Sequence, residues 1–164
     1  MAESYRIGLG NDIHRLAAGK PLVIGGVKID HDSGPDAHSD GDVLLHSLVD
    51  GLLGAAGLGD IGDLFPDSDE AYLDMESSKF VLEVMRLLKT NGWRPVNVDA
   101  VVMAQSPKLS PHKAAIRERV AELTGLPVEA VNIKAKTGEK VGPIGREEAI
   151  AAEVVVLIEM DSDG

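Results

Sequence analysis

The chain has 164 residues, an apolar fraction of 44% and a formal net charge of -11 at pH 7, which predict a single soluble globular domain over residues 1–164. The excess of acidic residues argues against nucleic-acid binding, which relies on a basic face. Because the chain has no cysteine, a metal ion would have to be held by histidines and carboxylates. We find no signal peptide and no segment apolar enough to cross a bilayer, so we expect a cytoplasmic protein that binds no membrane.

The first half of the chain is predicted to form two strand segments and one helix, at residues 5–10, 22–29 and 40–56. The second strand segment contains Gly25-Gly26, which indicates a break or a hairpin. Ser39 is followed three residues later by Asp42 and then by an apolar run, which is close to the capping pattern at a helix start.

A loop rich in Gly, Asp and Pro is predicted at residues 57–69. It carries four aspartates together with Ile61, Leu64 and Phe65, which a fully solvated loop would not need. The mixture favours a loop that folds over a site, as a lid does.

The second half is predicted to form two helices, at residues 75–89 and 110–124, and three strands, at residues 96–105, 131–137 and 149–160. Ser110 as N-cap and Pro111 at the first helical position predict the second helix start. The last strand carries V-V-V-L-I, which implies burial on both faces, and residues 161–164 are expected to be a frayed tail.

These elements predict an α+β domain, a mixed β-sheet with helices packed on one face. The other face must also be covered. A single domain of this kind often achieves that by forming an oligomer.

Asp12 and His14 are the first candidate metal ligands. Residues two apart in an extended segment point to the same side, so both side chains can reach one ion. His46 would arrive from the predicted helix and complete a set of two imidazoles and one carboxylate. Three protein ligands and one open position are typical of a catalytic zinc site. Taken alone, Asp12 and His14 would more often be turn or capping residues than metal ligands.

His46 itself allows two interpretations. Asp42, His46 and Asp50 are spaced four residues apart, so they share one stripe of the helix. That spacing fits a charge-paired surface histidine, and it fits equally a metal ligand surrounded by carboxylates. A closed structural site would need a fourth ligand, for which the stripe offers Asp42 or Asp50.

Two loops are candidates for anion binding. Residues 104–112 join a strand to a helix start, where free N–H groups and Lys108 favour an anion, although many such loops look alike. Residues 136–148 form a Gly-rich segment that places Thr137, Glu139 and Arg146 between two strands. That segment could supply a hydroxyl, a metal carboxylate and a cation, or it could be a plain hairpin loop.

Six stretches of sequence, in order and spanning nearly the whole chain, carry a resemblance to a known family: G-L-G-N-D-I-H, L-V-I-G-G-V, A-H-S-D-G-D-V-L-L-H, A-A-G-L-G-D-I-G-D-L-F-P-D-S-D, A-Q-S-P-K-L and I-K-A-K-T-G-E-K-V-G. The chain resembles the family of 2-C-methyl-D-erythritol 2,4-cyclodiphosphate synthases. These are phosphorus–oxygen lyases of non-mevalonate isoprenoid precursor biosynthesis. The resemblance implies conversion of 4-diphosphocytidyl-2-C-methyl-D-erythritol 2-phosphate to the cyclic diphosphate with release of CMP.

The resemblance also implies residue roles. The family's zinc ligands fall on Asp12, His14 and His46, and Glu139 would hold a second divalent cation, magnesium or manganese. His38 and Thr137 would stabilise the transition state. Contacts to the substrate are expected from these residues and from a wider set: Ser39, Asp60, Ile61, Gly62, Phe65, Asp67, Asp69, Ala104, Pro107, Lys108, Leu109, Ser110, Lys136 and Arg146.

Members of this family are homotrimers with active sites between subunits, so we expect a homotrimer with its sheets facing the three-fold axis. Lys136 stands where many relatives have Thr and is expected to add charge beside Thr137, unless its side chain points away. Pro143 stands where some relatives carry Phe, and two acids follow Arg146, so at most weak binding of an isoprenoid diphosphate is expected on the axis.

Two other functions fit the same residues. A zinc-dependent phosphohydrolase would use water as the nucleophile and give a linear product. A non-catalytic trimer that binds an isoprenoid or a nucleotide would need the metal ligands to be structural.

Overall fold

The computed structural model describes residues 4–66 and 68–161 of the chain. Its strands are β1 (Tyr5–Ala18), β2 (Leu22–Ile24), β3 (Val27–Ile29), β4 (Ser33–Pro35), β5 (Trp93–Met103), β6 (Val131–Lys136) and β7 (Ala149–Met160). Its α-helices are α1 (Val43–Ala56), α2 (Ile61–Leu64), α3 (Ser77–Thr90), α4 (Lys113–Thr124) and α5 (Gly142–Gly145), and short 3-10 turns are η1 (Glu70–Tyr72), η2 (Ser110–His112) and η3 (Val128–Ala130).

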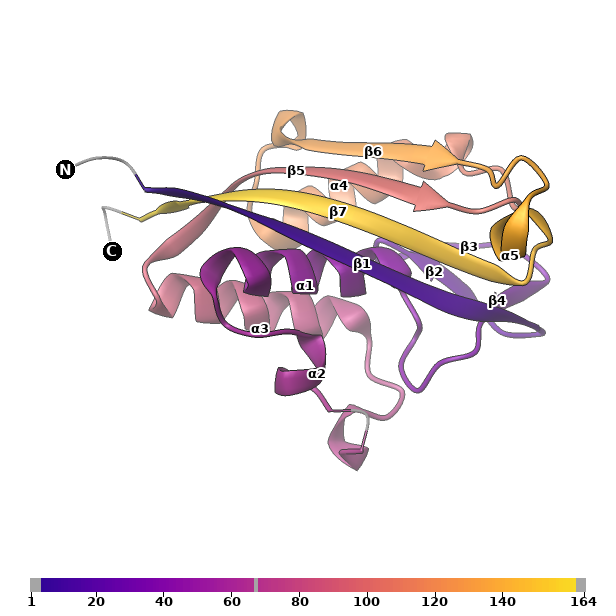
Figure 1. Ribbon diagram of the computed structural model, residues 1–164, viewed down its shortest axis with the longest axis horizontal. Coiled ribbons are helices and arrows are strands. Elements are labelled where there is room, and N and C mark those ends of the chain that lie inside the picture. Colours follow the sequence, from indigo (N-terminus) through magenta and orange to yellow (C-terminus); the bar gives the residue numbers. More distant parts are fainter. Residues whose placement is uncertain (1–3, 67, 162–164) are drawn as a thin grey trace.

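Five of the strands form one mixed sheet in the order β4-β1-β7-β5-β6 (Figure 1). Strand β7 pairs antiparallel with both β1 and β5, whereas β6 joins β5 in parallel. The segment around Gly25-Gly26 is a separate β2-β3 hairpin. The predicted α+β class with a mixed sheet is confirmed.

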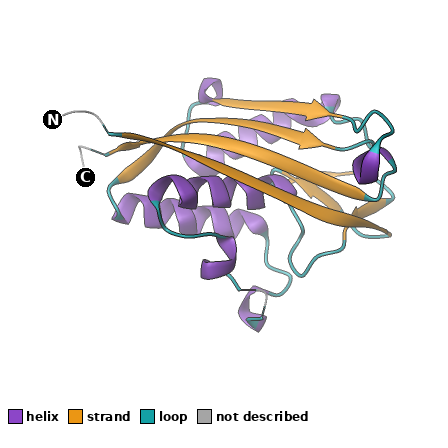
Figure 2. Cartoon of the chain, viewed as in Figure 1, coloured by secondary structure: helices purple, strands orange, loops and turns teal. Residues whose placement is uncertain are grey.

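Helices α1, α3 and α4 cover one face of the sheet, and α1 lies across β1 and β7 (Figures 1 and 2). The strands alternate, so the residues facing the helices are buried and form the core. Gly8 and Gly10 allow α1 to lie directly on β1, because a Cβ on Gly10 would be only 1.8 Å from the carbonyl oxygen of Ser47. This close approach brings the start of α1 beside the middle of β1.

The opposite face of β1 and β7 carries exposed apolar side chains. Ile7 and Leu9 are 75% and 65% exposed, and Val155, paired with Leu9, is 46% exposed. The burial of β7 on both faces that its apolar run implies is therefore not found within one chain. Among the described residues, this face of β1 and β7 therefore carries a strip of exposed apolar side chains.

Several element boundaries differ from those predicted. Strand β1 runs on to Ala18, so Asp12 and His14 lie within it. Helix α1 begins at Val43 with Asp42 as N-cap, and Ser39 precedes the helix. The predicted loop at residues 57–69 contains the helical turn α2.

The second predicted helix start also differs. Ser110 lies inside η2, whose N-cap is Leu109, and α4 begins only at Lys113 with His112 as its N-cap. The expected frayed tail lies mostly outside the described residues. In the described part of the chain, no helix is long and apolar enough to cross a membrane.

Candidate active site

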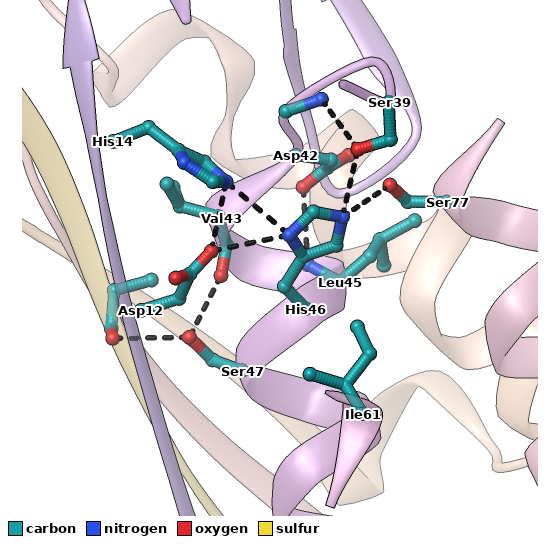
Figure 3. A network of polar contacts seen from close by, with 12 residues as sticks. Asp12, His14, Ser39, Asp42, Val43, Leu45, His46, Ser47, Ile61 and Ser77 are labelled. Atoms are coloured by element: carbon teal, nitrogen blue, oxygen red, sulfur yellow. Dashed lines mark hydrogen bonds and ion pairs between the residues drawn. The ribbon is translucent and has the colours of Figure 1, made fainter. Parts of the chain in front are cut away.

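Asp12, His14 and His46 meet at the contact between β1 and α1 (Figure 3). Asp12 Oδ2 lies 3.0 Å from His14 Nε2 and 3.2 Å from His46 Nδ1. The two imidazole nitrogens are 3.3 Å apart. Alternation along β1 puts the first two residues on the helix-facing side, and the glycine contact described above brings in the third.

These three ligand atoms fit one metal ion. Tetrahedral ligands about 2.0–2.1 Å from zinc are separated by about 3.3 Å, close to the three separations found here. Among the described residues, these three form the group of histidine and carboxylate side chains whose ligand atoms lie close enough together to share one metal ion. Both imidazoles and the carboxylate therefore converge as a facial set with one side open.

The pKa values of Asp12 and His46 depend on the contact between these two residues. Burial on its own would raise the pKa of Asp12, but hydrogen bonds to His14 and His46 outweigh it and lower that pKa to about 2. Burial opposes protonation of His46, yet the hydrogen bond to Asp12 raises the pKa of His46 above its usual value. The hydrogen bond between Asp12 and His46 therefore favours the charged form of each group.

The expected carboxylate neighbours of His46 have other partners. Asp42 is fully buried and accepts N–H bonds from Gly25, Gly26 and Leu45 at 2.7–3.0 Å. Asp50 accepts the N–H of Ile61 at 2.8 Å. Neither belongs to the metal-ligating group, but Asp42 and Asp50 lie close enough to His46 to interact with its charge, as the predicted acidic stripe implies. Asp42 instead ties the β2-β3 turn to α1.

A cleft of about 490 Å³ opens beside the three ligands. It is lined by several residues expected to touch the substrate, namely His38, Ser39, Ile61, Gly62, Phe65 and Asp69. Asp60 instead caps α2, with its side chain accepting the N–H of Asp63 at 3.0 Å. The prediction for Asp67 lies outside the described residues.

Aromatic side chains form one wall of this cleft, where the predicted Phe65 is joined by Tyr72 and Phe80, which were not predicted. Phe65 stacks on Phe80 with ring centroids 4.6 Å apart, and Tyr72 meets Phe65 edge-on at 5.4 Å. The lid-like segment is therefore anchored on α3. Phe80 gave no signal beyond its place in an apolar helical stripe.

A second cleft of about 350 Å³ lies where β5 and β6 end. It is lined by seven residues predicted to contact the substrate, Ala104, Pro107, Lys108, Leu109, Ser110, Lys136 and Thr137. It shares no lining residue with the first cleft. One chain thus presents two separate halves of the predicted site.

Glu139 and Arg146 lie beyond the linings of both clefts. The hydroxyl of Thr137 is 3.2 Å from Glu139 Oε1 and 3.3 Å from the Glu139 N–H, so these two residues form a polar corner. Arg146 makes a two-bond ion pair with Glu148, at 2.8 and 3.2 Å. Its charge is therefore already partly compensated.

The sequence matches the YgbB family over residues 5–159. The chain belongs to the YgbB family. A curated relative from Nitrosomonas eutropha, named 2-C-methyl-D-erythritol 2,4-cyclodiphosphate synthase, is 54% identical over 162 residues. That match covers 99% of this chain and 97% of the relative.

Solved structures agree with membership of the YgbB family. The bifunctional IspDF from Campylobacter jejuni has a TM-score of 0.93 at 41% identity, covering 97% of this chain and 43% of that one. A 2C-methyl-D-erythritol-2,4-cyclodiphosphate synthase in a CDP-bound form has a TM-score of 0.87 at 40% identity, covering 93% and 99%. The metal-ligating group found here accords with the metal dependence of the YgbB family.

Proposed function

We propose that this chain converts 4-diphosphocytidyl-2-C-methyl-D-erythritol 2-phosphate to 2-C-methyl-D-erythritol 2,4-cyclodiphosphate and CMP. The observation that carries the proposal is the converging set of Asp12, His14 and His46 beside an open cleft. Curated relatives over nearly the full chain length bear the name of this activity.

The protein need not supply the nucleophile in this reaction, because the substrate carries its own. An oxygen of the substrate's 2-phosphate forms a bond to the β-phosphorus, and the bond from that phosphorus to the CMP oxygen breaks. Catalysis of such a transfer rests on holding the two phosphates together and on offsetting their charge. Residues that position oxygens and carry positive charge are therefore the ones that matter.

We assign zinc to the Asp12, His14 and His46 centre and magnesium or manganese to Glu139. Two histidines and one carboxylate with an open position suit zinc. Magnesium is usually bound by one or two carboxylates together with oxygens of the substrate phosphates, so a single carboxylate suits it. When bound, these cations act as Lewis acids that offset phosphate charge in a chain of net charge -11.

The chain's own side chains complete the phosphate site. His38 and Ser39 line the cleft beside the metal ligands, and we assign them to the phosphates. Thr137 lies in the second cleft with Lys108 and Lys136, which supply hydroxyl and ammonium donors. Backbone groups of residues 104–110 would hold cytosine and ribose.

We infer a homotrimer whose sheets face a three-fold axis. The exposed apolar face of β1 and β7 requires a cover. The two clefts of one chain are separate, so a complete site would join the metal cleft of one subunit to the cytidine cleft of the next. On that axis, the Arg146–Glu148 pair favours at most weak binding of an isoprenoid diphosphate. The cytoplasmic location stays a prediction.

The test is CMP release from the proposed substrate, with phosphorus NMR of the product. We expect a cyclic diphosphate, and a loss of about a thousandfold or more in rate for His46→Ala, because Lewis-acid stabilisation contributes several kcal/mol. His31→Gln, which changes a histidine outside both clefts, should leave the rate unchanged. A linear product would indicate a phosphohydrolase.

Metal removal separates catalysis from ligand binding alone. A chelator should abolish CMP release and leave the protein folded, because an open three-ligand site is not needed for the fold. Unfolding on metal removal, with no CMP release from the metal-loaded protein, would support the non-catalytic binding protein instead. Circular dichroism and the CMP assay decide between the two.

A further inference from the structure

A chain of hydrogen bonds links the metal centre to the start of α3. His46 uses both ring nitrogens: Nδ1 faces Asp12 and His14, while Nε2 lies 2.8 Å from the hydroxyl of Ser77 (Figure 3). Ser77 is fully buried, and its hydroxyl is hydrogen-bonded to Asp40 Oδ1. The N–H of Ser77 donates to Asp40 Oδ2 at 2.9 Å.

The donors and acceptors give this chain a direction. A carboxylate only accepts, so the hydrogen of the Ser77 hydroxyl is donated to Asp40. The oxygen of that hydroxyl is then free to accept from the Nε2–H of His46. A metal-ligating imidazole is neutral and carries one N–H. With that N–H on Nε2, the lone pair lies on Nδ1, the nitrogen that faces Asp12 and His14. The network therefore selects the tautomer that a metal ligand needs.

We propose that Asp40 and Ser77 are a positioning pair for His46, which they hold in the ring orientation and tautomer that present Nδ1 to a metal ion. The proposal rests on the metal centre assigned under the proposed function. Outer partners of this kind commonly fix ligating histidines. Here the imidazole is hydrogen-bonded to the hydroxyl of Ser77, and that hydroxyl is in turn hydrogen-bonded to the carboxylate of Asp40.

The same two residues also dock α3. Glu76 at the N-cap of α3 makes no side-chain capping bond, and Asp40, far away in sequence, accepts the first N–H of the helix instead. A second contact joins the same segments, because the N–H of Asp74 donates to the carbonyl of His38 at 2.9 Å. Docking of α3 and the orientation of His46 therefore depend on one shared pair.

Ser39 is the other hydroxyl near His46 Nε2, at 3.2 Å. It already accepts the N–H of Gly41 at 3.2 Å, and it lines the open cleft, whereas Ser77 does not. Ser77 is the better partner for the imidazole, because its hydroxyl lies closer to Nε2 than that of Ser39 does. It is also buried and hydrogen-bonded to the carboxylate of Asp40. Ser39 is left available to the phosphate site.

The test compares zinc affinity, by competition with a chromophoric chelator, in the wild type and in Ser77→Ala, Asp40→Asn and Val84→Ala. Val84 is fully buried on the same helix, so its truncation destabilises α3 without removing the pair. We expect Ser77→Ala to lose about 10- to 100-fold in zinc affinity. Asp40→Asn should lose affinity in the same direction, whereas Val84→Ala should melt at a lower temperature with wild-type affinity.

A cobalt-substituted protein gives a second readout. The visible absorption bands of cobalt respond to ligand orientation, so Ser77→Ala should shift them and Val84→Ala should not. Unchanged zinc affinity and an unchanged cobalt spectrum in Ser77→Ala would overturn the proposal, as would equal losses in Ser77→Ala and Val84→Ala. If Ser77→Ala does not fold, the isosteric Asp40→Asn decides by the same criteria. Absence of zinc binding in the wild type would instead remove the metal centre itself.

Discussion

Individual side chains at the metal centre are prepared for a cation before one binds. Asp12 has a lowered pKa and is held between two imidazoles, while His46 has a raised pKa and carries hydrogen bonds on both ring nitrogens. The three ligand atoms already lie at separations that suit one divalent cation. The centre therefore needs little rearrangement to bind a metal.

Proton release on metal binding is the prediction at this scale. The raised pKa of His46 means that its proton is fully bound below the ordinary value and is lost only as pH rises through the raised value. Zinc must displace that proton, so apparent zinc affinity should fall as pH is lowered from about 8 to about 6. Calorimetric titration at neutral pH in two buffers of different ionisation enthalpy should give different heats.

Buffer-independent heats would contradict this prediction, because they would mean that no proton leaves the centre. His31→Gln is the control, since it removes a histidine that has no contact with the three ligands. That variant should release as many protons as the wild type.

At the scale of secondary-structure elements, α1 lies directly on β1. Gly10 and Gly8 leave no side chain between the strand and the backbone carbonyls of the helix. The hydroxyl of Ser47, the residue after His46, lies 3.0 Å from the carbonyl oxygen of Ala152 on β7. The position of His46 is therefore fixed in part by the packing of Ser47, the next residue, against β1 and β7.

Gly10→Ala is expected to disturb both the fold and the centre. The new Cβ would meet the Ser47 carbonyl at 1.8 Å, so α1 must move away from β1, at a cost of about 1–3 kcal/mol or more in the free energy of unfolding. Denaturant unfolding and zinc titration should show lower stability and weaker metal binding together.

Gly54→Ala is the matched control. Gly54 is exposed on the same helix, and a Cβ there would meet nothing within 4 Å. Removing a glycine from a helix interior should stabilise the protein by up to about 1 kcal/mol and leave metal binding unchanged. Equal behaviour of the two variants would argue against the close approach as the determinant of the centre.

At the scale of the whole molecule, two features favour the same oligomeric arrangement. The two clefts of one chain are separate, and the apolar face of β1 and β7 is exposed. An enzyme whose substrate carries both a metal-bound phosphate and a cytidine needs both clefts within reach of one ligand. Assembly through the faces of β1 and β7 would cover the apolar side chains and bring clefts of neighbouring subunits together. Oligomerisation and activity are therefore expected to be lost together.

Ile7→Asp tests this link. Ile7 is 75% exposed in the single chain, and a carboxylate buried between apolar strand faces is costly. We expect native mass spectrometry to show three copies for the wild type and a monomer without CMP release for the variant. Leu82→Asp, at a 54% exposed position on α3 in the helix layer, should stay trimeric and active. A trimeric Ile7→Asp protein would contradict the proposed interface.

The sequence by itself determined what depends on local periodicity. Alternation along β1 placed Asp12 and His14 on one side, and the helical pattern around His46 placed it near the start of α1, because side-chain direction repeats every two residues in a strand and every turn in a helix. The motif order was also enough to indicate the family, and with it several of the residues that line the two clefts.

Tertiary structure decided what depends on contacts between distant segments. Asp42 lies on the predicted stripe, yet it serves the Gly25-Gly26 turn, because a buried carboxylate must find donors wherever the fold supplies them. Ser77 and Phe80 had no local signal, since their roles at His46 and in the cleft exist only after α3 docks. The continuous apolar run of β7 predicted that both faces of this strand are buried. Only the folded chain shows which of the two faces remains exposed in a single chain.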